Sequence, residues 1–392
     1  MKILLYSGTL QTCPPEGYGA EVATWDLAEA LVKLGHEVLL AAPRGSKTPG
    51  RGALVEVSKT TPDQVGPNWL EVEWLESLRI VEEWAREVDV VHDLSCSVSL
   101  HHAACTGRRV DPSWTGSPAV CATPHLYTQN GIAWYEPRSS RHNVVVVSEA
   151  AYKLAREGRD EWAGTTLEGA RHPPLDAARI VRYGCDTEFY RPSLEAPDSK
   201  LVAYVGRPHP HKGLLYITEV AKLRPDLQFV CAWRAATREQ RLYDGDFRKL
   251  VGASALHNVE VLDLPTDPID HHRMKRDLVA QASVFLHPAI YVDACPRGVI
   301  EAQACGTPVV AFRRGGAPEL TFSGRTSVLV PAPREVPAAI PDATRALAAA
   351  LDVAAGLDRA KVREWALATL TRERMAEDYV NLYKRVLCGA RW

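Results

Sequence analysis

In the first part of the chain, short apolar runs alternate with segments whose apolar residues recur at helix-like spacing. Residues 3–6 form one apolar run (ILLY), and Leu27 and Leu31 belong to a pattern of near-helical spacing that follows it. Gly35 ends this helix, and residues 38–42 form a second apolar run. Strands that are apolar on both faces and joined by helices predict a parallel sheet covered on both sides. Further strands are predicted at residues 88–92, 119–123 and 143–148.

The same pattern recurs in the second half. A charged, proline-containing stretch at residues 190–200 interrupts it, and residues 201–206 (LVAYVG) restart it with a strand. The chain is therefore predicted to be an α/β protein with two doubly wound, Rossmann-like domains. Residues 359–386 are predicted to form one long amphipathic helix. The other predicted elements are helices at 214–222, 273–282 and 299–305 and strands at 228–232, 259–262, 283–286 and 308–312.

Composition narrows the class of protein. The 392 residues are 46% hydrophobic and 24% charged, which is typical of a globular protein long enough for two domains. A net charge of −2 excludes the broad basic surface that nucleic-acid binding favours. No apolar run approaches the ~20 residues of a membrane-spanning helix. Nine cysteines without CxxC spacing and a start without a leader-like pattern predict a cytoplasmic protein.

Two cations follow the strand that restarts the pattern. Arg207 and Lys212 bracket the loop GRPHPHKG at residues 206–213, which leads into a predicted helix. In parallel sheets, ligands bind beyond the carboxyl ends of the strands, so this loop is a candidate site. A guanidinium, an ammonium and a helix amino terminus together suit a diphosphate. The alternative is a solvated loop with a capping lysine.

Two carboxylates, Asp293 and Glu301, flank a proline- and glycine-containing loop eight residues apart. The amides of Arg297 and Gly298 lie between them, at the predicted start of a helix. A carboxylate in this position can accept hydrogen bonds from both hydroxyls of a ribose. The alternative is an acid that complements the helix dipole.

The following segment resembles a known family. Residues 301–320 (EAQACGTPVVAFRRGGAPEL) are similar to the donor-site signature of glycosyltransferase family 4, the retaining GT-B nucleotide-sugar transferases. Residues 206–213 resemble the GR…KG phosphate loop of that family, residues 34–38 its LGHEV turn and residues 181–189 its hinge. Two shorter matches, TPH at 123–125 and VSE at 147–149, fall in the expected order.

The resemblance implies a role for each matching position in the second domain. It implies that Arg207 and Lys212 bind the donor diphosphate and that Glu301 binds the ribose hydroxyls. The amides around Arg297 and Gly298 are implied to bind the distal phosphate.

Three further positions follow from the resemblance. Gly19 is implied to let the first loop approach the phosphates, and His125 to lie against the transferred sugar. Asp293 is implied to hold the 3- or 4-hydroxyl of that sugar. The family usually has Glu at this position, and the chain also departs from it at Cys295 and Pro296.

The resemblance implies a retaining, metal-independent hexosyltransferase of GT-B fold, with two domains facing across a cleft. Residues 1–185 are the predicted acceptor domain, residues 186–364 the donor domain, and residues 365–392 a helix returning to the first domain. The expected partners are a nucleotide-sugar donor, expected to be UDP-linked, and a soluble small-molecule acceptor. We expect no cofactor and no metal, because the histidine pairs lack a third ligand at a suitable spacing. The alternatives are a nucleotide-sugar epimerase of the same fold and a non-catalytic nucleotide-sugar-binding protein.

Overall fold

The computed structural model describes residues 1–8, 11–15, 19–57, 77, 79–95, 123–129, 143–157, 177–333 and 340–392. The chain forms two compact units. Unit 1 comprises residues 1–160, 170–184 and 372–392, and unit 2 comprises residues 161–169 and 185–371. The C-terminal segment thus belongs to the same unit as the N-terminus.

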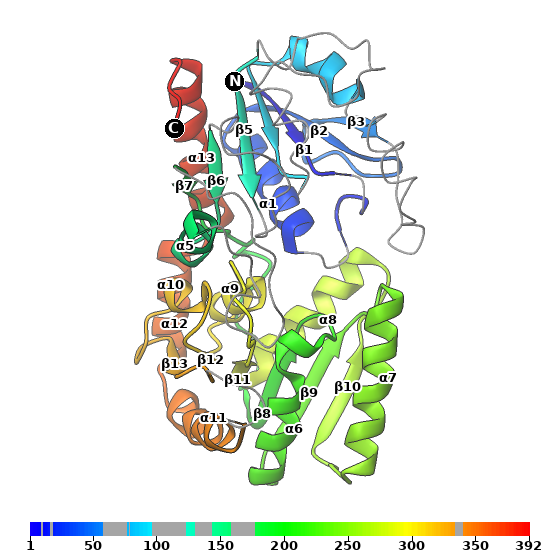
Figure 1. Ribbon diagram of the computed structural model, residues 1–392, viewed down its shortest axis with the longest axis vertical. Helices are drawn as coiled ribbons and strands as arrows, with labels where there is room; N and C mark the ends of the chain where they lie inside the picture. Colours follow the sequence, from blue (N-terminus) through cyan, green and yellow to red (C-terminus); the bar gives the residue numbers. More distant parts are fainter. Residues whose placement is uncertain are drawn as a thin grey trace. The chain divides into compact units, whose positions relative to one another are not determined.

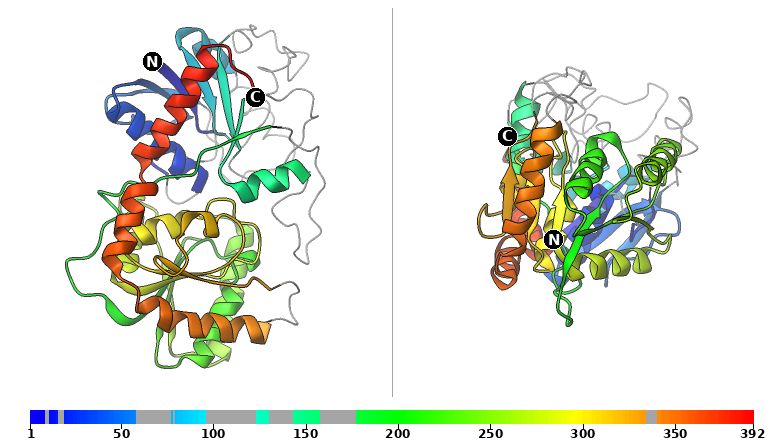
Figure 2. Two further views of the ribbon diagram at one scale, coloured as in Figure 1. Left: turned by 90° about the vertical axis from the view of Figure 1, so that its left-hand side faces the viewer. Right: turned by 90° about the horizontal axis from the view of Figure 1, so that it is seen from below.

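Unit 1 is built on a seven-stranded parallel sheet in the order β3-β2-β1-β4-β5-β6-β7 (Figure 1). Helix α13 lies beside α1 and also contacts β5 (Figure 2). The strands are β1 (Lys2–Tyr6), β2 (Glu37–Pro43), β3 (Ala53–Val57), β4 (Val90–Asp93), β5 (His125–Gln129), β6 (Val144–Val146) and β7 (Arg179–Ile180). In the described ranges the helices include α1 (Gly19–Lys33), the short 3-10 helix η2 (Ala85–Glu87), α5 (Glu149–Glu157) and α13 (Arg372–Leu387), and residues 79–84 are also helical.

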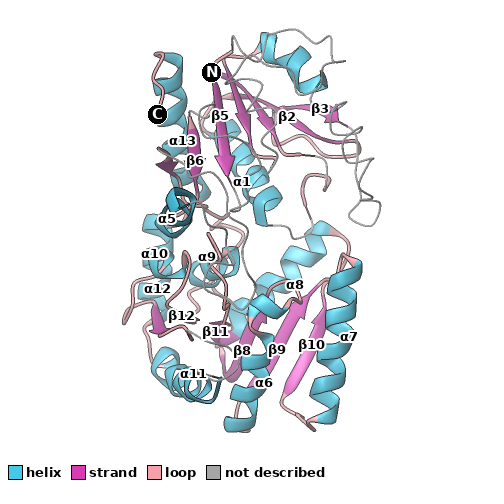
Figure 3. Cartoon of the chain, in the orientation of Figure 1, coloured by secondary structure: helices cyan, strands magenta, loops and turns pink. Residues whose placement is uncertain are grey.

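Unit 2 is built on a six-stranded parallel sheet in the order β10-β9-β8-β11-β12-β13. Helices cover both faces of this sheet (Figure 3), which confirms the doubly wound prediction. The strands are β8 (Asp198–Val205), β9 (Gln228–Trp233), β10 (Val259–Asp263), β11 (Ala282–His287), β12 (Val309–Phe312) and β13 (Ser327–Val330). The helices are the 3-10 helix η4 (Pro210–Lys212), α6 (Leu214–Leu223), α7 (Arg238–Ala253), α8 (Pro268–Gln281), α9 (Arg297–Ala304), α10 (Ala317–Leu320), α11 (Ile340–Ala355) and α12 (Arg359–Thr369).

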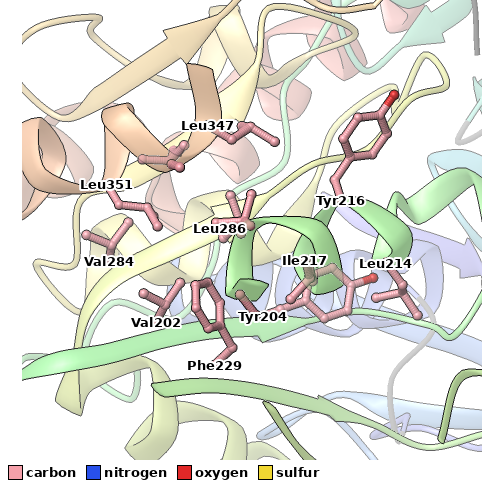
Figure 4. Close-up of a cluster of buried hydrophobic side chains, with 14 of the residues drawn as sticks. Val202, Tyr204, Leu214, Tyr216, Ile217, Phe229, Val284, Leu286, Leu347 and Leu351 are labelled. Atoms are coloured by element: carbon pink, nitrogen blue, oxygen red, sulfur yellow. The ribbon is translucent and has the colours of Figure 1, made fainter. Parts of the chain in front are cut away.

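The core of unit 2 explains why these strands are almost continuously apolar. Val202 and Tyr204 of β8 point to one face of the sheet, because side chains two residues apart share a face. They pack with Ile217 of α6 and Leu347 of α11, and all four are buried (Figure 4). Helix α8 contacts β8 and β11, and helix α9 contacts β11. A central strand covered by helices on both faces has no solvated side, so it carries no polar alternation.

Two predicted elements differ from the structure. The predicted strand at 119–123 lies mostly outside the described residues, and Thr123 is in a bend; the strand observed here is β5. Pro124 has no amide hydrogen to donate to a ladder, so the strand begins after it. The predicted helix at 359–386 is two helices, because the Cys185 amide donates to the Leu370 carbonyl at 3.0 Å, and Cys185 pairs with Thr371 as a single bridge. The chain leaves α12 at this point and enters α13 in unit 1.

Candidate active site

The site in unit 2 lies at the carboxyl ends of β8 and β11. These two strands are neighbours in the sheet. The chain continues from β8 to β9 on one side of this pair, and from β11 to β12 on the other side. The loops that follow β8 and β11 therefore diverge, and this is where doubly wound sheets bind ligands. The loop after β8 carries Arg207 and Lys212, and the loop after β11 carries Asp293.

The structure brings Lys212 and Asp293 together although they are 81 residues apart. The Lys212 ammonium donates to Asp293 Oδ2 at 2.6 Å and to the Tyr291 hydroxyl at 2.6 Å. The Lys212 and Asp293 side chains are only 15% and 16% exposed. Tyr291 is a member of the site that the sequence pattern did not reveal. Its place in the same loop, two residues before Asp293, was the available signal.

The charge state of the site follows from burial and from these neighbours. Burial alone disfavours the Asp293 carboxylate, but Lys212 and His287 outweigh it and hold the pKa of Asp293 below its ordinary value. His287 Nε2 lies 3.8 Å from Asp293 Oδ2. Burial lowers the pKa of His287 to about 4, even though Asp293 opposes this shift. At neutral pH the site therefore holds an ionised Asp293 and a neutral His287.

Glycines allow three loops to pack around Asp293. Gly213, between η4 and α6, has φ of 75°, and a Cβ there would lie 1.9 Å from the Pro288 carbonyl oxygen. Gly315 has φ of 62°, and a Cβ there would lie 2.4 Å from the Asp293 carbonyl oxygen. The Gly316 amide donates to the same carbonyl at 2.8 Å. These close approaches fix the Asp293 backbone, and no other residue type fits at these turns.

Helix α9 begins beside these loops. A Cβ at Gly298 would lie 2.8 Å from the Phe285 ring and 3.4 Å from the Val205 carbonyl oxygen. Gly298 therefore lets the amino end of α9 lie against the ends of β8 and β11. Arg297 is the first residue of α9, and its buried side chain lies 3.4 Å from Glu301 Oε1.

Glu301 lies one turn into α9 and is completely buried. Lys275 of α8 places its ammonium 2.6 Å from Glu301 Oε2, a partner that the sequence pattern did not predict. Burial disfavours the charged form of Glu301, but Lys275 and Arg297 outweigh it and lower the pKa of Glu301. The two predicted carboxylates are thus both ionised, each beside a lysine from another element.

The remaining predicted residues are more dispersed. Arg207 is exposed near the start of its loop, and its carbonyl oxygen lies 3.4 Å from the Tyr204 hydroxyl. Gly19 is the exposed first residue of α1 in unit 1. The preceding residues 16–18 lie outside the described part of the chain. The structure does not test the predicted roles of these residues.

His125 is the first residue of β5 and pairs with Val91. Its carbonyl accepts a hydrogen bond from Asn143 at 3.1 Å, and its ring lies 3.4 Å from the Thr123 carbonyl. Contact between His125 and a transferred sugar remains a prediction.

Among the described residues, no three His, Cys, Asp or Glu side chains are grouped so that they could hold a metal ion. None of the helices in those same ranges has both the length and the apolar composition required to cross a membrane.

Comparison with known proteins identifies the family. The model of the family described as "Glycosyl transferases group 1" matches residues 199–350, and that of "Glycosyltransferase Family 4" matches residues 18–161. This chain belongs to the family 4 glycosyltransferases. The first match includes the whole Lys212–Asp293 site.

Relatives and solved structures agree with this family. The chain is 33% identical over 178 residues to alpha-maltose-1-phosphate synthase of Mycolicibacterium smegmatis. That match covers 41% of this chain and 44% of the relative, so less than half of the relative is represented. AviGT4, a glycosyltransferase involved in avilamycin A biosynthesis, is 24% identical with a TM-score of 0.65, covering 100% of this chain and 99% of that one. HepE of Anabaena, solved in complex with UDP and glucose, is 16% identical with a TM-score of 0.66, covering 98% and 99%. The likeness to these solved structures shows that this chain has the GT-B fold.

Proposed function

We propose that this protein is a retaining glycosyltransferase that moves a hexose-type sugar from a nucleoside-diphosphate sugar to an acceptor hydroxyl. The observation that carries the proposal is the convergence of Lys212, Asp293 and the amino end of α9 at the switch point of one sheet. Membership of family 4 supports glycosyl transfer as the class of reaction.

The cations of the site act on the leaving group. As the bond between the sugar and the diphosphate breaks, negative charge develops on the phosphate oxygens. Lys212, Arg207 and the first amides of α9 stabilise that charge. Lys212 suits this role because its site is mostly buried, and a charge contact is stronger there than in water.

Retention follows from attack on the face that the diphosphate leaves. The acceptor oxygen bonds to the anomeric carbon as the phosphate oxygen departs from the same face. The acceptor proton passes to that departing oxygen, so the step requires no protein base. Asp293, ionised at neutral pH, accepts a hydrogen bond from a sugar hydroxyl, and Glu301 accepts those of the ribose.

We infer a UDP-linked donor because HepE, a neighbour of the same fold, was solved in complex with UDP and glucose. The acceptor is proposed to be a soluble small molecule, and the location cytoplasmic. The names of two relatives, alpha-maltose-1-phosphate synthase and the D-inositol 3-phosphate glycosyltransferase of Mycobacterium bovis, support this acceptor class.

The test incubates the purified protein with radiolabelled UDP-, ADP- and GDP-glucose and a panel of sugar phosphates and polyols. We expect acceptor-dependent release of UDP and a product whose anomeric configuration, measured by NMR, matches the donor. Nucleotide binding with no release would mean a non-catalytic binding protein. A changed sugar without acceptor would mean an epimerase, and an inverted product would contradict retention.

Metal independence is a separate part of the proposal. Because Lys212, Arg207 and the α9 amides already supply positive charge to the diphosphate, we expect turnover to survive excess EDTA. Loss of turnover that Mg²⁺ or Mn²⁺ restores would show that a metal supplies this charge instead.

A further inference from the structure

Lys275 is a lysine in an unusual environment. It lies in the middle of α8, yet its side chain is only 10% exposed, and Glu301, its partner at 2.6 Å, is 0% exposed. Lysine is almost never buried without a partner, because transfer of its charge from water is costly. The contact joins two helices that pack on the same sheet, and α8 contacts α9 directly.

Two ring-bearing side chains, Tyr190 and His271, also lie near Lys275. The Tyr190 ring centre lies 5.6 Å from the Lys275 ammonium, and the Tyr190 hydroxyl lies 2.9 Å from His272 Nδ1. His271 is buried, and burial together with the charge of Lys275 lowers its pKa to about 3, so its ring is neutral. Glu301 is therefore the anionic group that faces Lys275 in the described part of unit 2.

The two oxygens of Glu301 are held differently. Oε2 lies 2.6 Å from Lys275, whereas Oε1 lies 3.4 Å from the Arg297 guanidinium. The attraction between opposite charges weakens with distance, so the nearer Lys275 ammonium contributes more to the orientation of the carboxylate than Arg297 does. The Arg297 contact is the looser of the two and is the one that a ligand can replace.

We propose that Lys275 is a positioning residue that fixes Glu301 for recognition of the donor ribose. Lys275 keeps the carboxylate ionised and holds Oε2, while the ribose hydroxyls take the place of the looser Arg297 contact at Oε1. This inference rests on the proposed function, since it assigns the ribose to Glu301. Buried ion pairs seldom stabilise a fold more than apolar residues of similar volume do. A charged lysine here is therefore explained by the orientation that it imposes.

The test compares ribose and deoxyribose nucleotides. Calorimetry measures the affinities of UDP, ADP and GDP and of their 2′-deoxy forms for the whole protein. We expect the native chain to prefer the ribose form of its nucleotide by roughly ten- to a hundred-fold, as for a hydrogen bond to a charged group. In Lys275→Met this preference falls below about threefold, because UDP binding weakens while 2′-deoxy-UDP binding does not.

Three variants complete the comparison. Lys275→Arg keeps the charge and is expected to restore most of the preference. Lys249→Met is the matched control, because Lys249 is an exposed lysine on α7 paired with Asp246, and it should leave every affinity unchanged. If Lys275→Met does not fold, Lys275→Gln keeps an N–H donor without the charge and should show an intermediate preference.

The outcomes separate this inference from the proposed function. A native chain that binds no nucleoside diphosphate overturns both. A native preference for ribose that stays at its full size in Lys275→Met or Lys275→Gln overturns the role of Lys275 alone. Equal weakening of the ribose and deoxyribose forms also overturns it, since that result indicates only a structural contribution.

Discussion

At the level of single residues, the Lys212 ammonium already forms an ion pair with a carboxylate of the protein itself, that of Asp293. Asp293 and Tyr291 each present an oxygen 2.6 Å from this ammonium. A donor diphosphate must therefore share the Lys212 ammonium with Asp293 or displace Asp293 from it. This competition gives the two residues opposite effects on nucleotide affinity, although they belong to one site.

Replacement of Lys212 by alanine should weaken UDP binding by roughly ten- to a hundred-fold and lower turnover at least as much. The variant removes a charge-assisted contact in a mostly buried site. Calorimetry with UDP measures the effect. Lys222→Ala is the control, because Lys222 pairs with Glu219 on the exposed side of α6. Unchanged UDP affinity in Lys212→Ala would remove Lys212 from the phosphate site.

Replacement of Asp293 by asparagine should separate binding from catalysis. Turnover falls roughly ten- to a hundred-fold, because a neutral amide is a weaker acceptor for the sugar hydroxyl. UDP binding tightens, by roughly three- to ten-fold, because the charge of Lys212 is no longer neutralised by its neighbour. Asp246→Asn, at an exposed pair on α7, is the control.

A double variant tests the cause of the tighter binding. If Asp293 acts through Lys212, then Asp293→Asn has no effect on UDP affinity once Lys212 is alanine. Weaker UDP binding in the single Asp293→Asn variant would show that Asp293 does not compete with the diphosphate.

At the scale of elements, a buried polar network attaches α13 to the sheet of unit 1. His92 of β4 makes hydrogen bonds of 2.7 Å to the Tyr383 hydroxyl and to Thr128 Oγ1. Thr128 Oγ1 in turn lies 2.9 Å from the Tyr379 hydroxyl. Two strands and a helix are thus joined by directional bonds, which fix the register of α13 more strictly than apolar packing does.

Tyr383→Phe should destabilise unit 1 by about 1–3 kcal/mol, because it leaves one buried nitrogen of His92 without its partner. Thermal unfolding and hydrogen exchange of α13 measure the change. The matched control is Tyr243→Phe in unit 2, since the buried Tyr243 hydroxyl has no hydrogen-bond partner among the described residues. Equal effects of the two variants would mean that the network adds nothing beyond packing.

At the scale of the whole molecule, buried ionisable groups link stability to pH. Burial lowers the pKa of His92 to about 3, that of His271 to about 3 and that of His287 to about 4. In the unfolded chain these groups bind protons below about pH 6.5, so acidification favours unfolding. Asp93 acts in the opposite direction, because burial raises its pKa to about 7 and the folded chain then binds the extra proton.

The melting temperature should therefore fall between about pH 6.5 and about pH 4.5. Each of the three histidines contributes up to about 1.4 kcal/mol per pH unit, against one contribution of similar size from Asp93. His92→Gln should reduce this slope, whereas His257→Gln, at an exposed position, should not. A melting temperature that is constant or rises on acidification would contradict the prediction.

The architecture, and the places of chemical groups relative to the strands, follow from the amino-acid pattern alone. Short two-sided apolar runs joined by helices, such as residues 201–206, require a parallel sheet covered on both faces. Polar residues that follow such runs gather at one edge of the sheet, which is the reason for expecting Lys212 and Asp293 in one site, where the structure brings them together. Their order along the chain also allowed the family to be inferred from the amino-acid pattern alone.

Which groups pair with one another follows from the folded chain and not from local patterns, because pairing depends on packing between elements distant in sequence. Lys275 is an ordinary charge within a helix until α8 packs on α9 and excludes water, so nothing local distinguishes it. The break before α13 depends likewise on a bond between Cys185 and Leu370, and no pattern within residues 359–386 contains it. The Lys212–Asp293 contact arises because Gly213, Gly315 and Gly316 allow backbones to approach to distances that any side chain would prevent.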